Sequence, residues 1–176
     1  MKALVVYESM FGNTEAVARA IADGIRGVMD VELHEVAEAP APVTDPVDLI
    51  VVGGPTHAFS MTRPSTRAQA LSQGATHGEE AIGLREWLHR LEGGRHSELV
   101  AAFDTRVDKA RRLPGSAAKS AAKVAHRLGY APAGRRSFYV TDTSGPLLPG
   151  ELERAEAWGR KLATAMTVRA PDRHAS

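Results

Sequence analysis

The stretch ALVVYESMFGNTE, residues 3–15, indicates how the chain begins to fold. Residues 3–7 are a continuous apolar run, which is typical of a β-strand buried on both faces of a parallel sheet. The next residues carry hydroxyl, glycine and amide groups, and apolar residues then recur at helical spacing, so a helix is expected from Asn13. The stretch therefore predicts a strand, a loop and a helix whose first backbone N–H groups point out of the loop.

The alternation of short apolar runs and helical stripes continues along the chain. Further strands are predicted at residues 31–36, 48–53, 98–103 and 137–141. Helices are predicted at residues 13–28, 65–73, 84–91, 116–128 and 151–166. Five strands that alternate with helices predict a three-layer, doubly wound α/β fold with a five-stranded parallel sheet. The 44 residues between the third and fourth strands, 54–97, are more than one helix requires, so this insertion could form a lid or a partner surface.

The composition limits the classes of protein to which this chain could belong. The 176 residues are 43% hydrophobic and 24% charged, which predicts one globular domain over residues 1–168, followed by a flexible tail over 169–176. The absence of cysteine excludes disulfides, thiolate zinc sites and iron–sulfur clusters. A net charge of +1 argues against a nucleic-acid binder, and no apolar run approaches the roughly 20 residues of a membrane span. We expect a cytoplasmic protein.

Although the net charge of the chain is close to zero, one segment is strongly basic. Residues 104–136 hold nine basic residues against Asp104 and Asp108, a local balance of +7. Lys119, Lys123 and Arg127 recur every four residues, so they are expected on one helix face. The resulting basic stripe, from Arg106 to Arg127, would attract an acidic protein or the phosphates of NADPH. The alternative is a solvated surface without a partner.

Ligands of doubly wound folds bind beyond the carboxyl ends of the strands, which directs attention to loops 8–14, 54–64, 104–114 and 142–149. The first loop contains no Lys or Arg, so a phosphate there would be held by the neutral amides at the helix N-terminus. A plain turn with Asn13 or Thr14 as N-cap is the alternative. The chain contains neither G-x-x-x-x-G-K-[ST] nor G-x-G-x-x-G, so the usual nucleotide motifs are absent.

The loop residues carry a resemblance to a known family. Ser9-Met10-Phe11-Gly12-Asn13-Thr14 resembles the phosphate loop of the flavodoxin-like family, whose members bind FMN without a covalent bond. The aromatic Phe11 is similar to the branch that includes NAD(P)H:quinone oxidoreductases. Gly54-Pro55-Thr56-His57-Ala58-Phe59 and Phe103-Asp104-Thr105-Arg106 resemble the two loops that embrace the flavin. The resemblance covers essentially the whole chain and implies the strand order 2-1-3-4-5.

The resemblance also implies which residues contact FMN. Those of the first loop, which would surround the phosphate, are Ser9, Met10, Phe11, Gly12, Asn13 and Thr14. Those expected along one side of the ring are Pro55, Thr56, His57, Ala58 and Phe59, and those on the other side are Asp104, Thr105 and Arg106. Phe59 is the candidate for ring stacking, and Arg106 would favour the anionic reduced flavin. No catalytic acid or base and no metal site is predicted.

Three departures from the family bear on function. The isoelectric point near 8.2 contrasts with acidic flavodoxins, and residues 104–114 contain no aromatic side chain. No glycine occurs between Pro55 and Gln73, so a turn needing positive φ there would be strained. The leading interpretation is an FMN-binding electron-transfer protein of the flavodoxin type that serves a redox partner protein. The alternatives are an NAD(P)H-dependent flavin or quinone oxidoreductase, and a flavodoxin-fold interaction module that has lost FMN.

Overall fold

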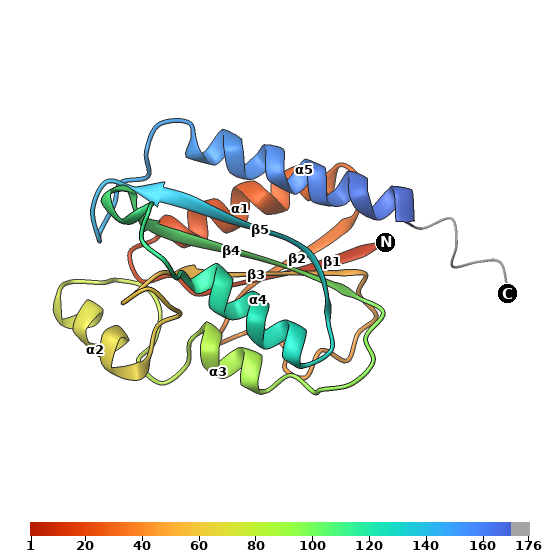
Figure 1. The fold of residues 1–176 in the computed structure, drawn as a ribbon, viewed down its shortest axis with the longest axis horizontal. Helices are drawn as coiled ribbons and strands as arrows, with labels where there is room; N and C mark the ends of the chain where they lie inside the picture. The colour runs from red at the N-terminus through yellow and green to blue at the C-terminus, as the bar shows by residue number, and fades with distance from the viewer. Residues whose placement is uncertain (170–176) are drawn as a thin grey trace, which may run out of the picture.

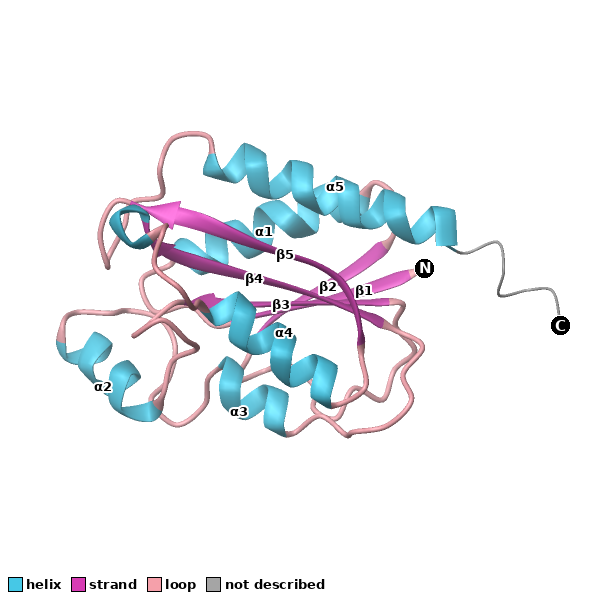
Figure 2. Cartoon of the chain, in the orientation of Figure 1, coloured by secondary structure: helices cyan, strands magenta, loops and turns pink. Residues whose placement is uncertain are grey.

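The computed structural model describes residues 1–169 and has a sheet between two layers of helices (Figures 1 and 2). All five strands are parallel, in the order β2-β1-β3-β4-β5, which confirms the predicted fold and strand order. The strands are β1 (Lys2–Tyr7), β2 (Asp30–Glu35), β3 (Leu49–Pro55), β4 (Leu99–Val107) and β5 (Ala131–Val140). The central strands are buried on both faces, because side chains alternate between two hydrophobic cores.

The two layers of helices cover opposite faces of the sheet (Figure 1). On one face lie α1 (Asn13–Arg26) and α5 (Glu151–Arg169), and on the other lie α3 (Leu84–His89) and α4 (Ala117–Arg127). The remaining helix, α2 (Pro64–Ser72), lies beyond the carboxyl ends of the strands, and a short 3₁₀ helix, η1 (Asp108–Ala110), follows β4. No helix within residues 1–169 has the length and apolar character needed to cross a membrane.

The last two strands begin or end elsewhere than predicted. β5 begins at Ala131 rather than at residue 137, since an edge strand tolerates Pro132 and a register shift opposite Val100 and Ala101 accommodates Gly134. β4 continues to Val107, so Asp104 and Thr105 pair with β3 and do not belong to a loop. Of the predicted tail, Arg169 ends α5, and residues 170–176 lie outside the described part of the chain.

The first and last helices cross with almost no space between their backbones. A Cβ added to Gly24 of α1 would lie 2.1 Å from the carbonyl oxygen of Glu156, and one added to Gly159 of α5 would lie 2.2 Å from that of Ile21. Real Cβ atoms do not approach backbone oxygens so closely. These two glycines therefore set the distance between α1 and α5.

A buried polar network holds the connection between β3 and β4 against the end of β1. Glu8 is buried directly after β1, and its two carboxylate oxygens accept hydrogen bonds from Thr62 Oγ1 (2.6 Å) and from the backbone N–H of Leu84 (2.7 Å). Each carboxylate oxygen thus has a donor, which compensates part of the cost of burying the group. The contacts join β1 to two points of the insertion that are 22 residues apart, 62 and 84.

Arg67 extends this network into α2. Its fully buried guanidinium donates to Thr62 Oγ1 (2.9 Å) and to the carbonyl of Glu80 (2.8 Å), and it forms an ion pair with Glu86 (3.0 Å). Thr62 therefore accepts from Arg67 while it donates to Glu8. The network fixes α2 at the carboxyl edge of the sheet.

The glycine contact between α1 and α5 can be tested with a matched pair of substitutions. We expect Gly159→Ala to lower the free energy of unfolding by about 2 kcal/mol, because the added methyl group overpacks the crossing although alanine favours a helix. Gly27→Ala is the control, since Gly27 has φ −66° and open space around its Cβ position, and it should cause no loss. Urea unfolding of both variants measures the difference. Equal stabilities would contradict the close crossing.

The buried carboxyl of Glu8 should leave a signature in the pH dependence of stability. Burial raises the pKa of Glu8, so the folded state retains this proton at pH values where the unfolded chain has released it. The contribution of Glu8 to stability is therefore complete below the ordinary glutamate pKa and is lost as pH rises through the folded pKa. In urea unfolding between pH 4 and 8, the wild-type free energy of unfolding should fall relative to that of Glu8→Gln as pH rises. A difference that grows with pH would show that hydrogen bonding outweighs burial.

Candidate cofactor site

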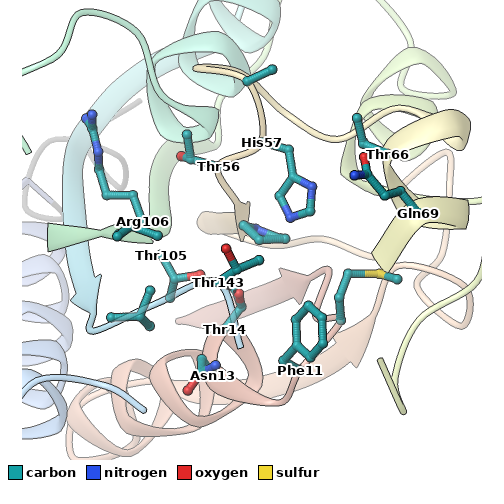
Figure 3. A pocket seen from close by; sticks show the side chains of 15 residues that line it. Phe11, Asn13, Thr14, Thr56, His57, Thr66, Gln69, Thr105, Arg106 and Thr143 are labelled. Atoms are coloured by element: carbon teal, nitrogen blue, oxygen red, sulfur yellow. Dashed lines mark hydrogen bonds between the residues drawn. The ribbon is translucent and has the colours of Figure 1, made fainter. Parts of the chain in front are cut away.

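A cavity of about 290 Å³ opens at the carboxyl edge of the sheet (Figure 3). Its walls come from the start of α1, the ends of β3, β4 and β5, and α2. The residues that line it are Met10, Phe11, Asn13, Thr14, Pro55, Thr56, His57, Ala58, Thr66, Gln69, Thr105, Arg106, Val107, Val140 and Thr143. The position agrees with the general rule for doubly wound sheets, and the volume is at the lower end of the usual range for ligand pockets.

The structure brings ten of the fourteen predicted site residues to this cavity. The ten are Met10, Phe11, Asn13, Thr14, Pro55, Thr56, His57, Ala58, Thr105 and Arg106. The four that do not line it are Ser9, Gly12, Phe59 and Asp104. The predicted contacts of all fourteen with a cofactor remain predictions.

The start of α1 presents amides rather than side chains. The N-cap is Gly12, with φ +83°, and not Asn13 or Thr14 as the alternative prediction had it. Gly12 has no side chain to cap the helix, and the N–H groups of Asn13 and Thr14 precede the first intrahelical hydrogen bonds. These amides at the positive end of the helix dipole form a site suited to an anion.

Ser9 shapes this loop from the inside. It is buried, and its Oγ accepts hydrogen bonds from the N–H groups of Gly12 (3.1 Å) and Glu15 (3.3 Å). Asn13 links the loop to the segment after β5, because its Nδ2 donates to the carbonyl of Ser144 (3.0 Å). Both residues act on the loop conformation through contacts within the protein.

Two threonines join α1 to β4 beside the cavity. Thr14 Oγ1 and Thr105 Oγ1 lie 2.7 Å apart, and both side chains are buried and line the cavity. One hydroxyl proton is used between the two oxygens, so the pair retains a second proton that it can donate to a ligand.

The turn after β3 is strained. His57 and Ser60 exchange two backbone hydrogen bonds of 3.0 Å, and the two residues between them, Ala58 and Phe59, have φ +45° and +63°. The glycine-free segment thus does contain a turn of positive φ, the condition under which the sequence predicts strain. Each left-handed residue costs roughly 1 kcal/mol, and such strain concentrates at functional sites.

The strained turn directs its two aromatic rings differently. The His57 ring lines the cavity (Figure 3), and burial lowers the pKa of this imidazole, which favours its neutral form. Phe59 has 51% of its surface exposed and does not line the cavity, so its stacking on a cofactor ring stays a prediction.

Asp104 and Arg106 hold the segment after β4. Asp104 is fully buried, and its Oδ2 accepts the N–H of Ala118 (2.8 Å) at the start of α4. Arg106 lines the cavity with its stem, while its guanidinium points away from the centre (Figure 3) and donates to the carbonyls of Ala110 and Leu113. Its Nε is buried without a hydrogen-bond partner.

Sequence reasoning missed five lining residues: Thr66, Gln69, Val107, Val140 and Thr143. Thr66 and Gln69 come from α2, and nothing in the length of the insertion indicates which way that helix faces. Val107 and Thr143 lie within loops 104–114 and 142–149, to which the rule for strand ends directed attention, but neither was singled out as a site residue. Val140 lies within the predicted last strand, close to its carboxyl end.

Comparison with known proteins adds a family match over part of the chain. The family model for flavodoxin matches residues 5–79, which include the end of β1, the loop before α1 and the whole of β3. No curated protein sequence matches the chain.

Solved structures resemble the fold over nearly the whole chain. A flavodoxin from the domain Archaea has 22% identity and a TM-score of 0.62, with 95% of this chain and 99% of that chain covered. The Streptococcus pneumonia TIGR4 flavodoxin has 20% identity and a TM-score of 0.64, with 94% and 99% covered. Two-electron reduced Megasphaera elsdenii flavodoxin has 17% identity and a TM-score of 0.58, with 92% and 98% covered.

These identities are low, and the structural likeness by itself establishes the fold alone. The matched residues 5–79 add the strand, loop and helix start that carry the phosphate-loop pattern. Flavodoxin family members bind FMN. The family match over residues 5–79, the strand order and the fold all agree, and together they support a flavodoxin-like FMN-binding family.

Proposed function

We propose that the protein binds FMN in the cavity at the carboxyl edge of the sheet and transfers electrons in the manner of a flavodoxin. The observation that carries the proposal is the uncapped start of α1, where amide groups face the cavity beside the hydroxyl pair of Thr14 and Thr105. This arrangement suits an anion that is held without a Lys or Arg in the loop.

The residues present fit FMN at both ends of the molecule. A phosphate would be held by the amides of Asn13 and Thr14 and by the spare hydroxyl proton of the threonine pair. A ring would lie against Thr56, His57 and Ala58.

The protein's own contribution would be to hold and orient the cofactor, while bound FMN supplies the redox chemistry. Ser9 and Gly12 keep the loop open toward the anion, and Asp104 fixes the start of α4. The neutral His57 and the largely uncharged walls would exclude water from one side of the ring without adding a formal charge.

An acidic redox protein is the proposed partner. Lys119, Lys123 and Arg127 of α4 are exposed, and none of the three forms an ion pair within residues 1–169. This basic stripe supports steering of a negatively charged partner toward the cavity. The cytoplasmic location expected from composition remains part of the proposal.

A second candidate function is an NAD(P)H-dependent flavin or quinone oxidoreductase. The observation that favours it is α2, whose Thr66 and Gln69 add polar groups to the cavity wall opposite α1 (Figure 3). Such a wall suits a small substrate. Reduction of the FMN-loaded protein by NADPH, followed by quinone reduction, supports the oxidoreductase, whereas slow NADPH oxidation with rapid exchange between redox proteins supports the carrier.

The phosphate assignment gives a direct test. We expect Thr14→Val to weaken FMN binding about 10- to 100-fold, because it removes a hydrogen bond to a charged group, and to leave riboflavin binding nearly unchanged. Titration of the apoprotein with each flavin, followed by fluorescence, measures both affinities.

Thr66→Val on α2 is the matched control and should affect the two flavins alike, since Thr66 lies on the cavity wall away from the start of α1. Equal losses for both flavins in Thr14→Val would overturn the phosphate site. Failure of the wild type to bind either flavin would favour the interaction module that has lost FMN.

A further inference from the structure

Two large apolar side chains are exposed close to the mouth of the cavity. Phe59 is 51% exposed on the strained turn, and Leu113 is 47% exposed on the segment that follows η1. The two segments meet at Gly115, where an added Cβ would lie 2.6 Å from the carbonyl oxygen of Phe59. Exposed apolar groups gathered from separate segments mark interaction sites more often than single scattered ones do.

The backbone on either side of this patch is tightly held. Arg85 donates hydrogen bonds to the carbonyls of Met61 (3.0 Å) and Thr62 (3.1 Å), directly after the turn. On the other segment, the guanidinium of Arg106 donates a hydrogen bond to the carbonyl of Leu113 (3.2 Å), which restrains the backbone of that residue. These contacts hold the backbone of Phe59 in its left-handed conformation and keep the side chain exposed.

Within residues 1–169, the exposed charges near Leu113 and Phe59 that lack an ion-pair partner are basic. Lys109, Arg112 and Lys119 are exposed, and none of them has an ion-pair partner among the residues that the structure describes. Asp108, the acidic residue of the same segment, is paired with Arg111 at 2.6 Å. An apolar centre with a charged rim is the usual anatomy of a protein interface, and this rim complements an acidic surface.

We propose that Phe59 and Leu113 form the apolar centre of a docking surface for an acidic redox protein, with Lys109, Arg112 and Lys119 as its rim. The proposal rests on the proposed function, since Ala58 of the same turn lines the cavity and a docked protein would come close to a cofactor there. Phe59 then serves the partner and not the flavin ring. The five residues are called the Phe59 patch below.

The test measures binding without electron transfer. The probe is the soluble domain of cytochrome b5, an acidic haem protein, and cytochrome c is the basic counterpart. Binding to the immobilised protein is measured at low and high salt, both with FMN and without it. We expect cytochrome b5 to bind at low salt, to weaken at least tenfold at high salt, and to bind more tightly than cytochrome c.

Phe59→Asn separates docking from folding. Asparagine tolerates a positive φ better than phenylalanine, so the melting temperature should equal or exceed that of the wild type. Its affinity for cytochrome b5 should nevertheless fall at least fivefold, and its FMN affinity should not change. Leu152→Asn on α5 is the control, because Leu152 is also an exposed leucine but lies away from the patch.

The rim is tested by the double reversal Lys109→Glu with Arg112→Glu, which should lower affinity at low salt by at least tenfold and have little effect at high salt. Lys161→Glu on α5 is the matched charge control. Wild-type affinity in Phe59→Asn, a loss of FMN affinity in that variant, or tighter binding of cytochrome c would each overturn the proposal. Patch-dependent binding of an oligonucleotide in place of cytochrome b5 would also overturn it.

The outcomes distinguish this proposal from the function on which it rests. If the protein binds cytochrome b5 through the Phe59 patch but binds no flavin, the proposed electron transfer fails while the docking surface stands as that of an interaction module. If the protein binds FMN and the patch variants bind cytochrome b5 like the wild type, the docking surface fails alone.

Discussion

The site depends on a buried carboxylate that must be satisfied. Glu8 directly follows β1 and is buried, and its two hydrogen-bond donors come from the connection between β3 and β4. Because a buried carboxyl group without hydrogen-bond partners is costly, this requirement favours a connection that folds back over the end of β1. Arg67 adds α2 to the same arrangement, so a wall of the cavity is positioned by an interaction outside the cavity.

The cavity itself combines rigid and strained parts. Its floor is made by strand ends and by the start of α1, whose conformations are fixed by the sheet and by Ser9. One side is formed by a turn with two residues in the left-handed region, which the surrounding contacts keep in place. The two strained residues thus lie in a turn that has Ala58 on the cavity wall and Phe59 exposed to solvent.

Much of this could be predicted from the sequence, because hydrophobic periodicity reports burial directly. The apolar run at residues 3–7 and the pattern around Asn13 were sufficient for the strand, the loop and the helix start. The strained turn also followed from a simple absence of glycine. Periodicity failed where polar residues continue a strand, as at Asp104, which pairs with β3 and whose buried carboxylate accepts the N–H of Ala118 at the start of α4. Periodicity predicted α2 but not the direction in which it faces. Arg67 is linked through Thr62 to Glu8, 59 residues earlier in the chain, and no local pattern shows that connection.

The crossing of α1 and α5 at Gly24 and Gly159 has a consequence for the order in which the protein matures. The two helices are far apart in the sequence, so the side of α1 that packs on α5 cannot be covered until α5 has been synthesised. During synthesis on the ribosome, that side of α1 would stay open to other apolar surfaces, while its side toward the sheet can be covered earlier by the strands.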